Sequence, residues 1–390
     1  MTFTSLGLPG TGPGAGDPGR RGGDDVQIRV VRPDELGASD LESWRAFQGS
    51  GATAHPFLAP EFVLAVGRVR PQLRVAVLEE SAGSVGFFPF ERGPLGYGTP
   101  PAPGLTDAHG LVHAPDVEWD PQQLLRACGL SVWEFDHLVD GQKPFERFQA
   151  LRVPSPVMDL GGGYAAFRAH VRSRSKSFLS ELERKGRALG RDHGAVTFTL
   201  GTADPDGLRQ IMDWKSQQYQ RTGRSDRFRV PWIRELLESL LDTRTESFAG
   251  TLSVLRAGDT PVAGHFGLRS GASLAGWFPA FDLGFRQYSP GLLHHLMLAE
   301  HAAADGIVEI DMGRGAKGYK DCFRSRDLVV AEGRIVRRGP AAALHWARRE
   351  PVRRLRNRVL DDPRLYAAAD RVLKRAASVR TRVVPGTVRS

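Results

Sequence analysis

The chain has 390 residues and a formal net charge of +9. From Pro340 onward it carries 13 Lys and Arg residues against 4 Asp and Glu residues, an excess equal to the charge of the whole chain. The remainder is therefore neutral overall, which argues against a nucleic-acid-binding body, because such a body is basic throughout. No apolar run approaches the roughly 18 residues that cross a bilayer, and the length predicts two domains of about 100–200 residues each.

Residues 1–25 are rich in glycine and proline, and they predict a disordered tail. No charged segment followed by an apolar one opens the chain, so we expect no secretory signal. The sequence has two cysteines, Cys128 and Cys322, and neither has CxxC or Cys/His spacing. We therefore expect reduced thiols, no metal site and a cytoplasmic location.

Three helical patterns occupy the middle of the chain. The segment Val171–Leu189 places six Lys and Arg residues at helical spacing beside a narrow apolar stripe. Such a run is typical of a solvated helix face; the alternative is a basic lip that contacts the phosphates of a cofactor or substrate. Apolar repeats predict two further helices, over Leu208–Tyr219 and Trp232–Leu241.

Three strand-like runs follow, Gly250–Leu255, Val262–Leu268 and Ser273–Phe281, with glycine-containing turns between them as in an antiparallel meander. After the meander, Ser289 fits a helix N-cap and Pro290 fits the first helical position. A helix that begins this way presents unpaired N–H groups and a partial positive charge. It is either an ordinary capped helix or a site for a phosphate or pyrophosphate.

The stretch Ile307–Gly315 reads as a short buried strand that runs into a glycine-rich loop. Three cations, Arg314, Lys317 and Lys320, accompany this loop. Beyond Pro340, the basic tail predicts two helices. They either contact an anionic membrane or an acidic partner, or they form a solvated cap on the second domain.

Taken together, these motifs resemble the CelD-like acetyltransferases, also called BioF2-like, of the GNAT superfamily. They are also similar to the Fem peptidoglycan aminoacyltransferases, which use two GNAT-like domains in tandem. In the second half, over about residues 172–338, the resemblance rests on Trp277–Asp282, Tyr288–Gly291, Asp311–Gly315 and Tyr319–Lys320 in fixed order. In the first half it rests on His55–Leu58, Leu73–Leu78, Val85–Phe90, Gly104–Gly110 and Ser155–Leu160.

The resemblance implies an α/β fold of tandem GNAT-like domains, each with a mixed, mostly antiparallel sheet flanked by helices. The expected segments are a tail at 1–25, an N-terminal domain on the acceptor side at 26–160, a C-terminal acyltransferase domain at 161–338 and a basic helical tail at 339–390.

The implied function is an N-acyltransferase that moves an acyl group from acetyl-CoA or another acyl-CoA to a primary amine. The expected acceptor is a small molecule, such as an amino sugar in polysaccharide or envelope synthesis. Two alternatives stay open. One is a Fem-like transferase that draws on aminoacyl-tRNA, and the other is a non-catalytic scaffold with a degenerate donor site.

The resemblance further implies that the donor lies where the third strand of the meander leads into the next helix. The backbone of that strand would supply N–H donors to the oxyanion. The family's loop usually reads Arg/Gln-x-x-Gly-x-Gly/Ala, whereas this chain has serine for the first glycine and, after it, a proline that lacks an N–H. The residues expected to bind the cofactor are Trp277, Phe278, Arg286, Gln287, Tyr288, Ser289 and Gly291.

Lys320 is the first catalytic candidate, because a lysine at the matching position of the resembling Fem enzymes stabilises the transition state. Tyr319 belongs to the same motif. For the base, Asp282 ends the central strand beside the donor loop, although it could instead cap a turn. His265 is a second candidate, since its side-chain type suits proton transfer, but a histidine inside a strand is more often a core residue. Asp311 is the third, and it is also placed to order the glycine loop.

Acceptor-binding residues are expected between the two domains, because ligand sites favour domain interfaces. Asp107 and His109 belong to a first-half motif of the resembling family and would line this cleft. The full set expected to contact the acceptor is Asp107, His109, Lys215, Tyr219, Asp311 and Arg314.

Overall fold

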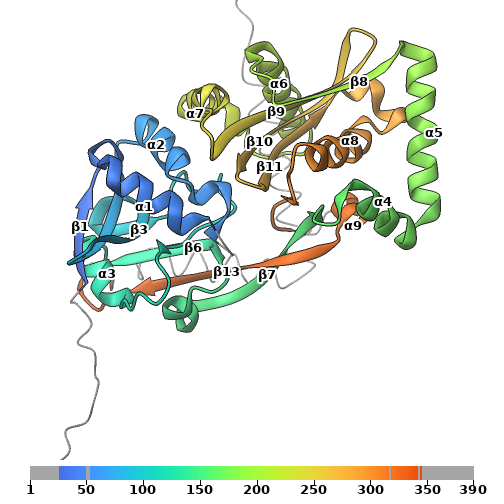
Figure 1. Ribbon diagram of the computed structural model, residues 1–390. Helices are drawn as coiled ribbons and strands as arrows, with labels where there is room; N and C mark the ends of the chain where they lie inside the picture. The colour runs from blue at the N-terminus through green and yellow to red at the C-terminus, as the bar shows by residue number, and fades with distance from the viewer. Residues whose placement is uncertain (1–25, 50–52, 316–317, 341–342, 345–390) are drawn as a thin grey trace, which may run out of the picture.

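The computed structural model describes residues 26–49, 53–315, 318–340 and 343–344 (Figure 1). In these residues one sheet runs through both halves of the molecule, in the order β1-β2-β3-β4-β6-β13-β7-β12-β11-β10-β9-β8, with β5 paired to β3. The pairs β4–β6 and β11–β12 are parallel and the others are antiparallel. Helices flank the sheet, so the expected α/β class with a mixed, mostly antiparallel sheet is confirmed.

The first half contains three helices and seven strands within the described residues. They are β1 (Gln27–Val31), α1 (Ala38–Gln48), α2 (Pro60–Val69), β2 (Leu73–Glu80), β3 (Gly83–Arg92), β4 (Tyr97–Thr99), β5 (Val112–His113), α3 (Pro121–Ala127), β6 (Val132–Val139) and β7 (Gln149–Asp159).

The second half contains six helices and six strands within the described residues. They are α4 (Gly163–Arg174), α5 (Lys176–His193), β8 (Val196–Leu200), α6 (Pro205–Arg221), α7 (Pro231–Asp242), β9 (Phe248–Ala257), β10 (Thr260–Ser270), β11 (Ser273–Phe281), α8 (Pro290–Ala304), β12 (Glu309–Asp311), α9 (Gly318–Phe323) and β13 (Arg326–Val336).

The two halves repeat one order of main elements. Each has a strand, two helices, three strands, a helix, a strand, a short helical turn and a last strand; β5 is an addition to the first half, and α4 and α5, which precede β8, are additions to the second. The antiparallel meander expected from the sequence is confirmed as β9, β10 and β11. The expected helix over 171–189 is two helices, because Ser175 adopts an extended backbone between α4 and α5 and its Oγ caps the Phe178 N–H.

The last strand of each half pairs with the other half. β13 pairs with β6 of the first half, and the end of β7 pairs with β12 of the second. β7 and β13 also pair with each other, and Figure 1 shows this long ribbon joining the two halves. The proposed division at residues 160 and 161 remains a prediction about segments of sequence, because the sheet itself is shared.

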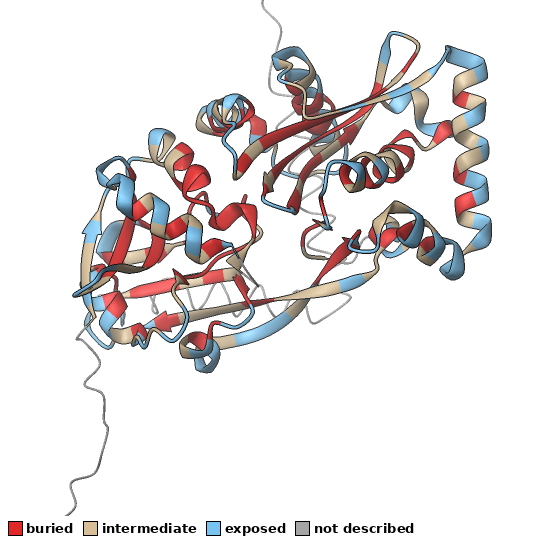
Figure 2. Cartoon of the chain, viewed as in Figure 1, coloured by how far each residue is buried: buried red, intermediate tan, exposed pale blue. Residues whose placement is uncertain are grey.

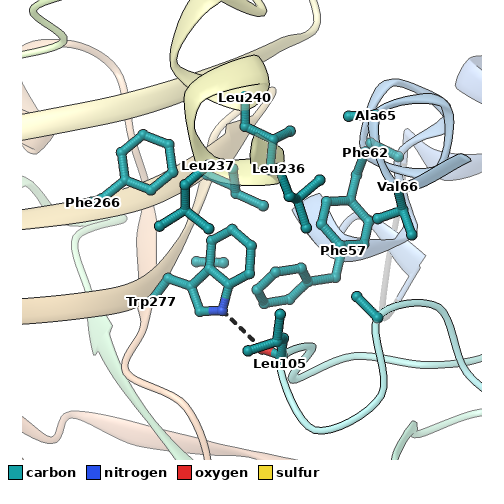
Figure 3. Packing of buried hydrophobic residues seen from close by; sticks show 14 of the residues in the cluster. Phe57, Phe62, Ala65, Val66, Leu105, Leu236, Leu237, Leu240, Phe266 and Trp277 are labelled. Carbon is teal, nitrogen blue, oxygen red and sulfur yellow. Dashed lines mark hydrogen bonds between the residues drawn. The ribbon is translucent and has the colours of Figure 1, made fainter. Parts of the chain in front are cut away.

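One hydrophobic core spans the junction between the halves. Trp277 of β11 packs edge-to-face against Phe57, with ring centroids 5.1 Å apart, and against Phe62 of α2. Its indole N–H donates to the carbonyl of Leu105, 2.8 Å away (Figure 3). In Figure 2 the buried residues concentrate along the sheet and on the helix faces turned towards it. The two halves therefore stabilise each other through side chains that neither half buries alone.

The expected tail at 1–25 lies outside the described residues, as does most of the expected basic tail at 339–390. Within the described residues, no helix has the length and apolar content required for a membrane span.

Candidate active site

The loop between β11 and α8 has a left-handed residue at the start of the helix. Ser289 has φ 54° and ψ 50°, a conformation that glycine adopts without steric cost. Its carbonyl accepts the N–H groups of Leu292 and Leu293, so the predicted N-cap position is confirmed. Its side chain makes no capping hydrogen bond, contrary to the sequence-based expectation. The serine that replaces the family's glycine thus keeps the backbone conformation typical of glycine.

Helix α5 lies against this loop. Lys185 Nζ donates to Ser289 Oγ at 3.0 Å, and the buried Tyr288 donates its hydroxyl to Asp192 Oδ2 at 2.7 Å. Arg286 and Gln287, on the same turn, are exposed to solvent. Lys185, Arg286 and the Gly291 N–H of the first helical turn are therefore the groups that can hold an anion here. Lys185 thus lies where the basic lip was expected, and its contact with phosphates stays a prediction.

Strands β11 and β12 separate beside this loop. They pair in parallel only over Ser273–Ala275 and Glu309–Asp311, after which β11 continues to Phe281 with β10 alone as its sheet partner among the described residues. The ammonium of Lys215, on α6, donates at 2.8 Å to the carbonyl of Pro279, in the stretch of β11 that extends beyond β12. Lys215 is 8% exposed and also lies 5.9 Å from the Tyr219 ring centroid. Both residues were expected to bind the acceptor; here Lys215 stabilises the strand that would line the donor site.

The expected site residues Trp277, Phe278 and His265 lie in the core. Trp277 and Phe278 are 9% and 3% exposed, and their rings pack against aromatic neighbours rather than facing solvent. His265 is 2% exposed, and its Nε2 accepts the Trp277 N–H at 3.0 Å. Burial lowers the pKa of His265 to about 3, so it stays neutral. The geometry therefore gives His265 a structural role at the β10–β11 bulge. Its ring also takes up the backbone N–H of Trp277, which was one of the N–H groups expected to bind the oxyanion.

Asp311 orders the glycine-rich loop, which was the second role expected for it. Its Oδ1 accepts the Gly313 N–H at 2.9 Å and the Ser155 hydroxyl at 2.6 Å. Its Oδ2 lies 3.1 Å from Nε2 of His55, which belongs to the first half. Burial tends to raise the pKa of Asp311, but these partners lower it below its usual value, so the carboxylate is ionised. Asp311 is 2% exposed and does not face a substrate.

Lys320 and Tyr319 of α9 lie beside this loop. Lys320 is 4% exposed, and its Nζ donates to the carbonyl oxygens of Gly313 at 2.5 Å and Arg314 at 3.2 Å. Tyr319 packs edge-to-face on His295 of α8, with ring centroids 5.4 Å apart. Burial raises the pKa of Tyr319 to about 12, so its hydroxyl keeps its proton and can act as a hydrogen-bond donor. Burial and the charges of Lys215 and Lys320 lower the pKa of His295 to about 4.

Asp107, from the first half, reaches the same place. A Cβ on Gly313 would lie 2.8 Å from Asp107 Oδ2, so the close approach requires the glycine, whose φ is 75°. Burial raises the pKa of Asp107, while nearby His137 and, more weakly, His55 and Lys320 oppose this effect. The side chain remains 28% exposed. A partly accessible carboxyl group with a raised pKa is suited to accept a proton.

His109 does not line a cleft, contrary to the expectation. It is 2% exposed, and its Nε2 lies 2.9 Å from Thr106 Oγ1. Its backbone N–H and carbonyl are both hydrogen-bonded to β6, at His137 and Val139. Burial lowers its pKa to about 3. Arg314 likewise has partners within the protein, because it donates to the Asp136 carbonyl at 2.5 Å and to Glu332 Oε2 at 3.0 Å. Both residues position the loops at the junction.

His109, Asp136 and His137 bring three potential metal-ligand atoms within 4.8 Å of one another. These atoms already have protein partners. His109 Nδ1 accepts the His137 N–H at 3.3 Å, and His137 Nδ1 lies 3.0 Å from Asp136 Oδ1. The group therefore satisfies its polar atoms without an ion.

Asp282 caps the turn after β11, which was the alternative role expected for it. Its Oδ1 accepts the Gly284 N–H at 2.8 Å. The junction instead gathers residues that were not expected as site residues, because it brings together segments far apart in sequence. These residues are His55, Asp136, His137, Ser155 and His295.

Residues 176–321 match the family model described as an acetyltransferase (GNAT) domain. No curated protein matches the chain. Among solved structures, similarity is found to the C-terminal domain (DUF2156) of a putative lysylphosphatidylglycerol synthetase from Agrobacterium fabrum, at 14% identity over 80% of this chain and 95% of that one, with a TM-score of 0.49. FemX is similar at 10% identity over 78% of this chain and 96% of its own, with a TM-score of 0.49. A tandem GNAT protein from the clavulanic acid biosynthesis pathway is similar at 9% identity over 80% and 98%, with a TM-score of 0.44.

Proposed function

Since residues 176–321 form an acetyltransferase (GNAT) domain, we propose that this protein transfers an acyl group from an acyl-CoA to a primary amine. The observation that carries the proposal is the start of α8, where Lys185, the exposed Arg286 and the Gly291 N–H surround a turn whose residue Ser289 adopts the backbone conformation of a glycine. This group can hold the pyrophosphate of coenzyme A. The proposed acceptor class is an amino sugar or a related envelope or polysaccharide precursor.

The acceptor arrives as an ammonium ion and must lose one proton before its nitrogen attacks the thioester carbon. We assign this proton to Asp107, because it is the carboxyl group at the junction that combines partial exposure with a raised pKa. As the new C–N bond forms and the C–S bond breaks, the nitrogen loses a second N–H proton. The electron pair of the C–S bond leaves on the coenzyme A sulfur, which takes up that proton.

Two groups beside the loop suit the charges that develop during this step. The Lys320 ammonium stabilises nearby negative charge and fixes the Gly313 and Arg314 carbonyls. The Tyr319 hydroxyl, protonated at neutral pH, can donate a hydrogen bond to the leaving sulfur. Lys215 holds the stretch of β11 that extends beyond β12 through the Pro279 carbonyl. The acceptor would thus enter from the first half and the donor from the second.

The test is calorimetric titration of the purified chain with coenzyme A, acetyl-CoA and palmitoyl-CoA. We expect binding that weakens about tenfold or more in Lys185→Glu and in Arg286→Glu, corresponding to about 1.4 kcal/mol. Lys143→Glu, at an exposed position on the first half, is the matched control and should bind as wild type does. If no thioester binds, the acyl-CoA proposal fails and an aminoacyl-tRNA donor or a scaffold takes its place.

A further inference from the structure

An irregularity in β6 places two consecutive side chains towards the junction. In the pairing of β6 with β13, Leu138 opposes Ala331 and Phe135 opposes Gly333, so Asp136 and His137 together face one residue, Glu332. This is a β-bulge, which breaks the alternation of side chains along a strand. Arg314 from the glycine-rich loop fixes the bulge, because it bonds to both the Asp136 carbonyl and Glu332.

The bulge aligns three titratable groups from the junction outward. His137 Nε2 lies 3.4 Å from Asp107 Oδ1, and His137 Nδ1 lies 3.0 Å from Asp136 Oδ1. The imidazole is 13% exposed, whereas the Asp136 side chain at the outer end is 49% exposed. The ring of His109 packs edge-to-face on the ring of His137. His109 Nδ1 also accepts the backbone N–H of His137, so the two contacts together position this residue.

We propose that His137 carries the proton away from Asp107 and releases it to solvent beside Asp136. This inference rests on the proposed function and adds a positioning and relay role for two residues outside the matched domain. Asp107 first takes the proton of the acceptor amine. Its O–H then protonates His137 Nε2, the Nδ1 proton passes to water beside Asp136, and Asp107 returns to its ionised form.

The charges around these residues favour proton transfer from Asp107 through His137 towards Asp136. Hydrogen bonding to His137 and the charges of His109, His137 and Arg314 outweigh burial and lower the pKa of Asp136 to about 2. Asp136 therefore remains ionised and stabilises the imidazolium that forms next to it. At the Asp136 end, the nearby Arg314 is paired with Glu332. At the Asp107 end, Asp311, His55 and Lys320 also act on the carboxyl group.

The test compares two acceptors with acetyl-CoA as the donor. Glucosamine arrives largely as an ammonium ion and must be deprotonated, whereas hydroxylamine is uncharged at neutral pH. In His137→Ala we expect transfer to glucosamine to fall about 100-fold, and transfer to hydroxylamine to stay within about twofold of wild type. Added imidazole should restore the glucosamine rate, because it can take the place of the missing ring.

Controls separate the possible failures. His113→Ala removes a half-buried histidine on β5 outside the relay and should leave both rates unchanged. Asp136→Asn keeps the shape of the outer residue and should also lower the glucosamine rate selectively. Equal losses with both acceptors, no loss with either, or no rescue by imidazole would overturn the relay. If wild type acylates neither acceptor while coenzyme A still binds, the assigned acceptor class fails instead.

Discussion

The two halves of the chain share an order of elements but differ where their parallel strands end. In the first half β4 pairs in parallel with β6, and the chain then returns so that His109 forms a bridge with Leu138 of the same strand. In the second half β12 ends at Asp311, and the chain turns away through Gly313 while β11 continues. In the first half, the chain that returns through His109 therefore covers the edge of β6. In the second half, within the described residues, the edge of β11 beyond Ala275 has no strand partner on the β12 side, and Lys215 contacts it through Pro279.

The helices that follow differ in the same way. In α3 the carboxylate of Asp120 accepts the N–H groups of Gln122 and Gln123, so a negative side chain already fills the helix N-terminus. In α8 the corresponding position holds Ser289, whose side chain instead contacts Lys185. An anion would be repelled at the first helix and attracted at the second. The difference agrees with the proposal that the second half binds the donor, while the first supplies Asp107 and His137.

Removing the indole that joins the halves should have the largest effect. Trp277→Ala should lower the free energy of unfolding by about 3–5 kcal/mol, because a buried ring in the shared core leaves a cavity. Urea denaturation should still show one transition by fluorescence and by circular dichroism. Trp119→Ala, a half-buried site confined to the first half, is the control and should cost less. Two separate transitions in Trp277→Ala, with only one shifted, would show that the halves fold independently.

Asp107→Asn should lower acyl transfer to an amine by about 100-fold, or about 2.7 kcal/mol in activation free energy, with coenzyme A affinity unchanged. Asp282→Asn is the matched control, because that carboxylate caps a turn of the second half, and transfer should stay within about threefold of wild type. Steady-state rates with acetyl-CoA and glucosamine measure both. A larger loss in Asp282→Asn would show that the general base is Asp282 of the second half and not Asp107.

Acidification should destabilise the fold through buried neutral histidines, most of them in the second half. Burial lowers the pKa of His109 and His265 to about 3 and that of His295 to about 4, and it also lowers the pKa of His294. Between pH 6.5 and these values the unfolded chain binds protons that the folded chain does not, so stability falls as the pH falls. Each group contributes about 1.4 kcal/mol per pH unit in this window.

Urea midpoints measured from pH 7 to pH 5 test this prediction. His295→Asn should reduce the slope, whereas His113→Ala, outside the buried set, should leave it unchanged. Stability that does not vary with pH would contradict the burial of these neutral rings.

The smallest expected effect concerns Ser289. Ser289→Gly and Ser289→Ala both remove the hydroxyl that accepts from Lys185, but only glycine relieves the positive φ. The glycine variant should therefore be more stable than the alanine variant by about 1 kcal/mol. Thermal unfolding of the two variants, measured under the same conditions, compares their stabilities. Equal stabilities would contradict the left-handed conformation of Ser289.

Local signals in the sequence predicted the parts of the site that local structure determines. The meander, the start of α8 at Pro290 and the loop-ordering role of Asp311 follow from strand patterns, cap chemistry and a carboxylate placed before a glycine turn. The family match then agreed with the expected acyltransferase domain. These features need only contacts within a few residues, or a motif read along the chain.

The remaining features depend on contacts between distant segments. The burial of His265 and His109, the partners of Arg314 and the exchange of β7 and β13 between the halves are set by packing that no local pattern encodes. The β6 bulge is similar, because its register depends on β13, almost 200 residues later. Lys185 was visible only as one cation in a basic run, and its contact with Ser289 requires the fold.

The most direct test of an active site assembled from both halves is hydrogen–deuterium exchange of the full chain with and without acetyl-CoA. We predict slower exchange at residues 284–293, where the donor binds, together with slower exchange at residues 104–109 of the first half, where its acyl end would meet Asp107. Protection confined to the separate cavity of about 230 Å³ lined by Asp204, Gln210 and Arg256 would contradict this account.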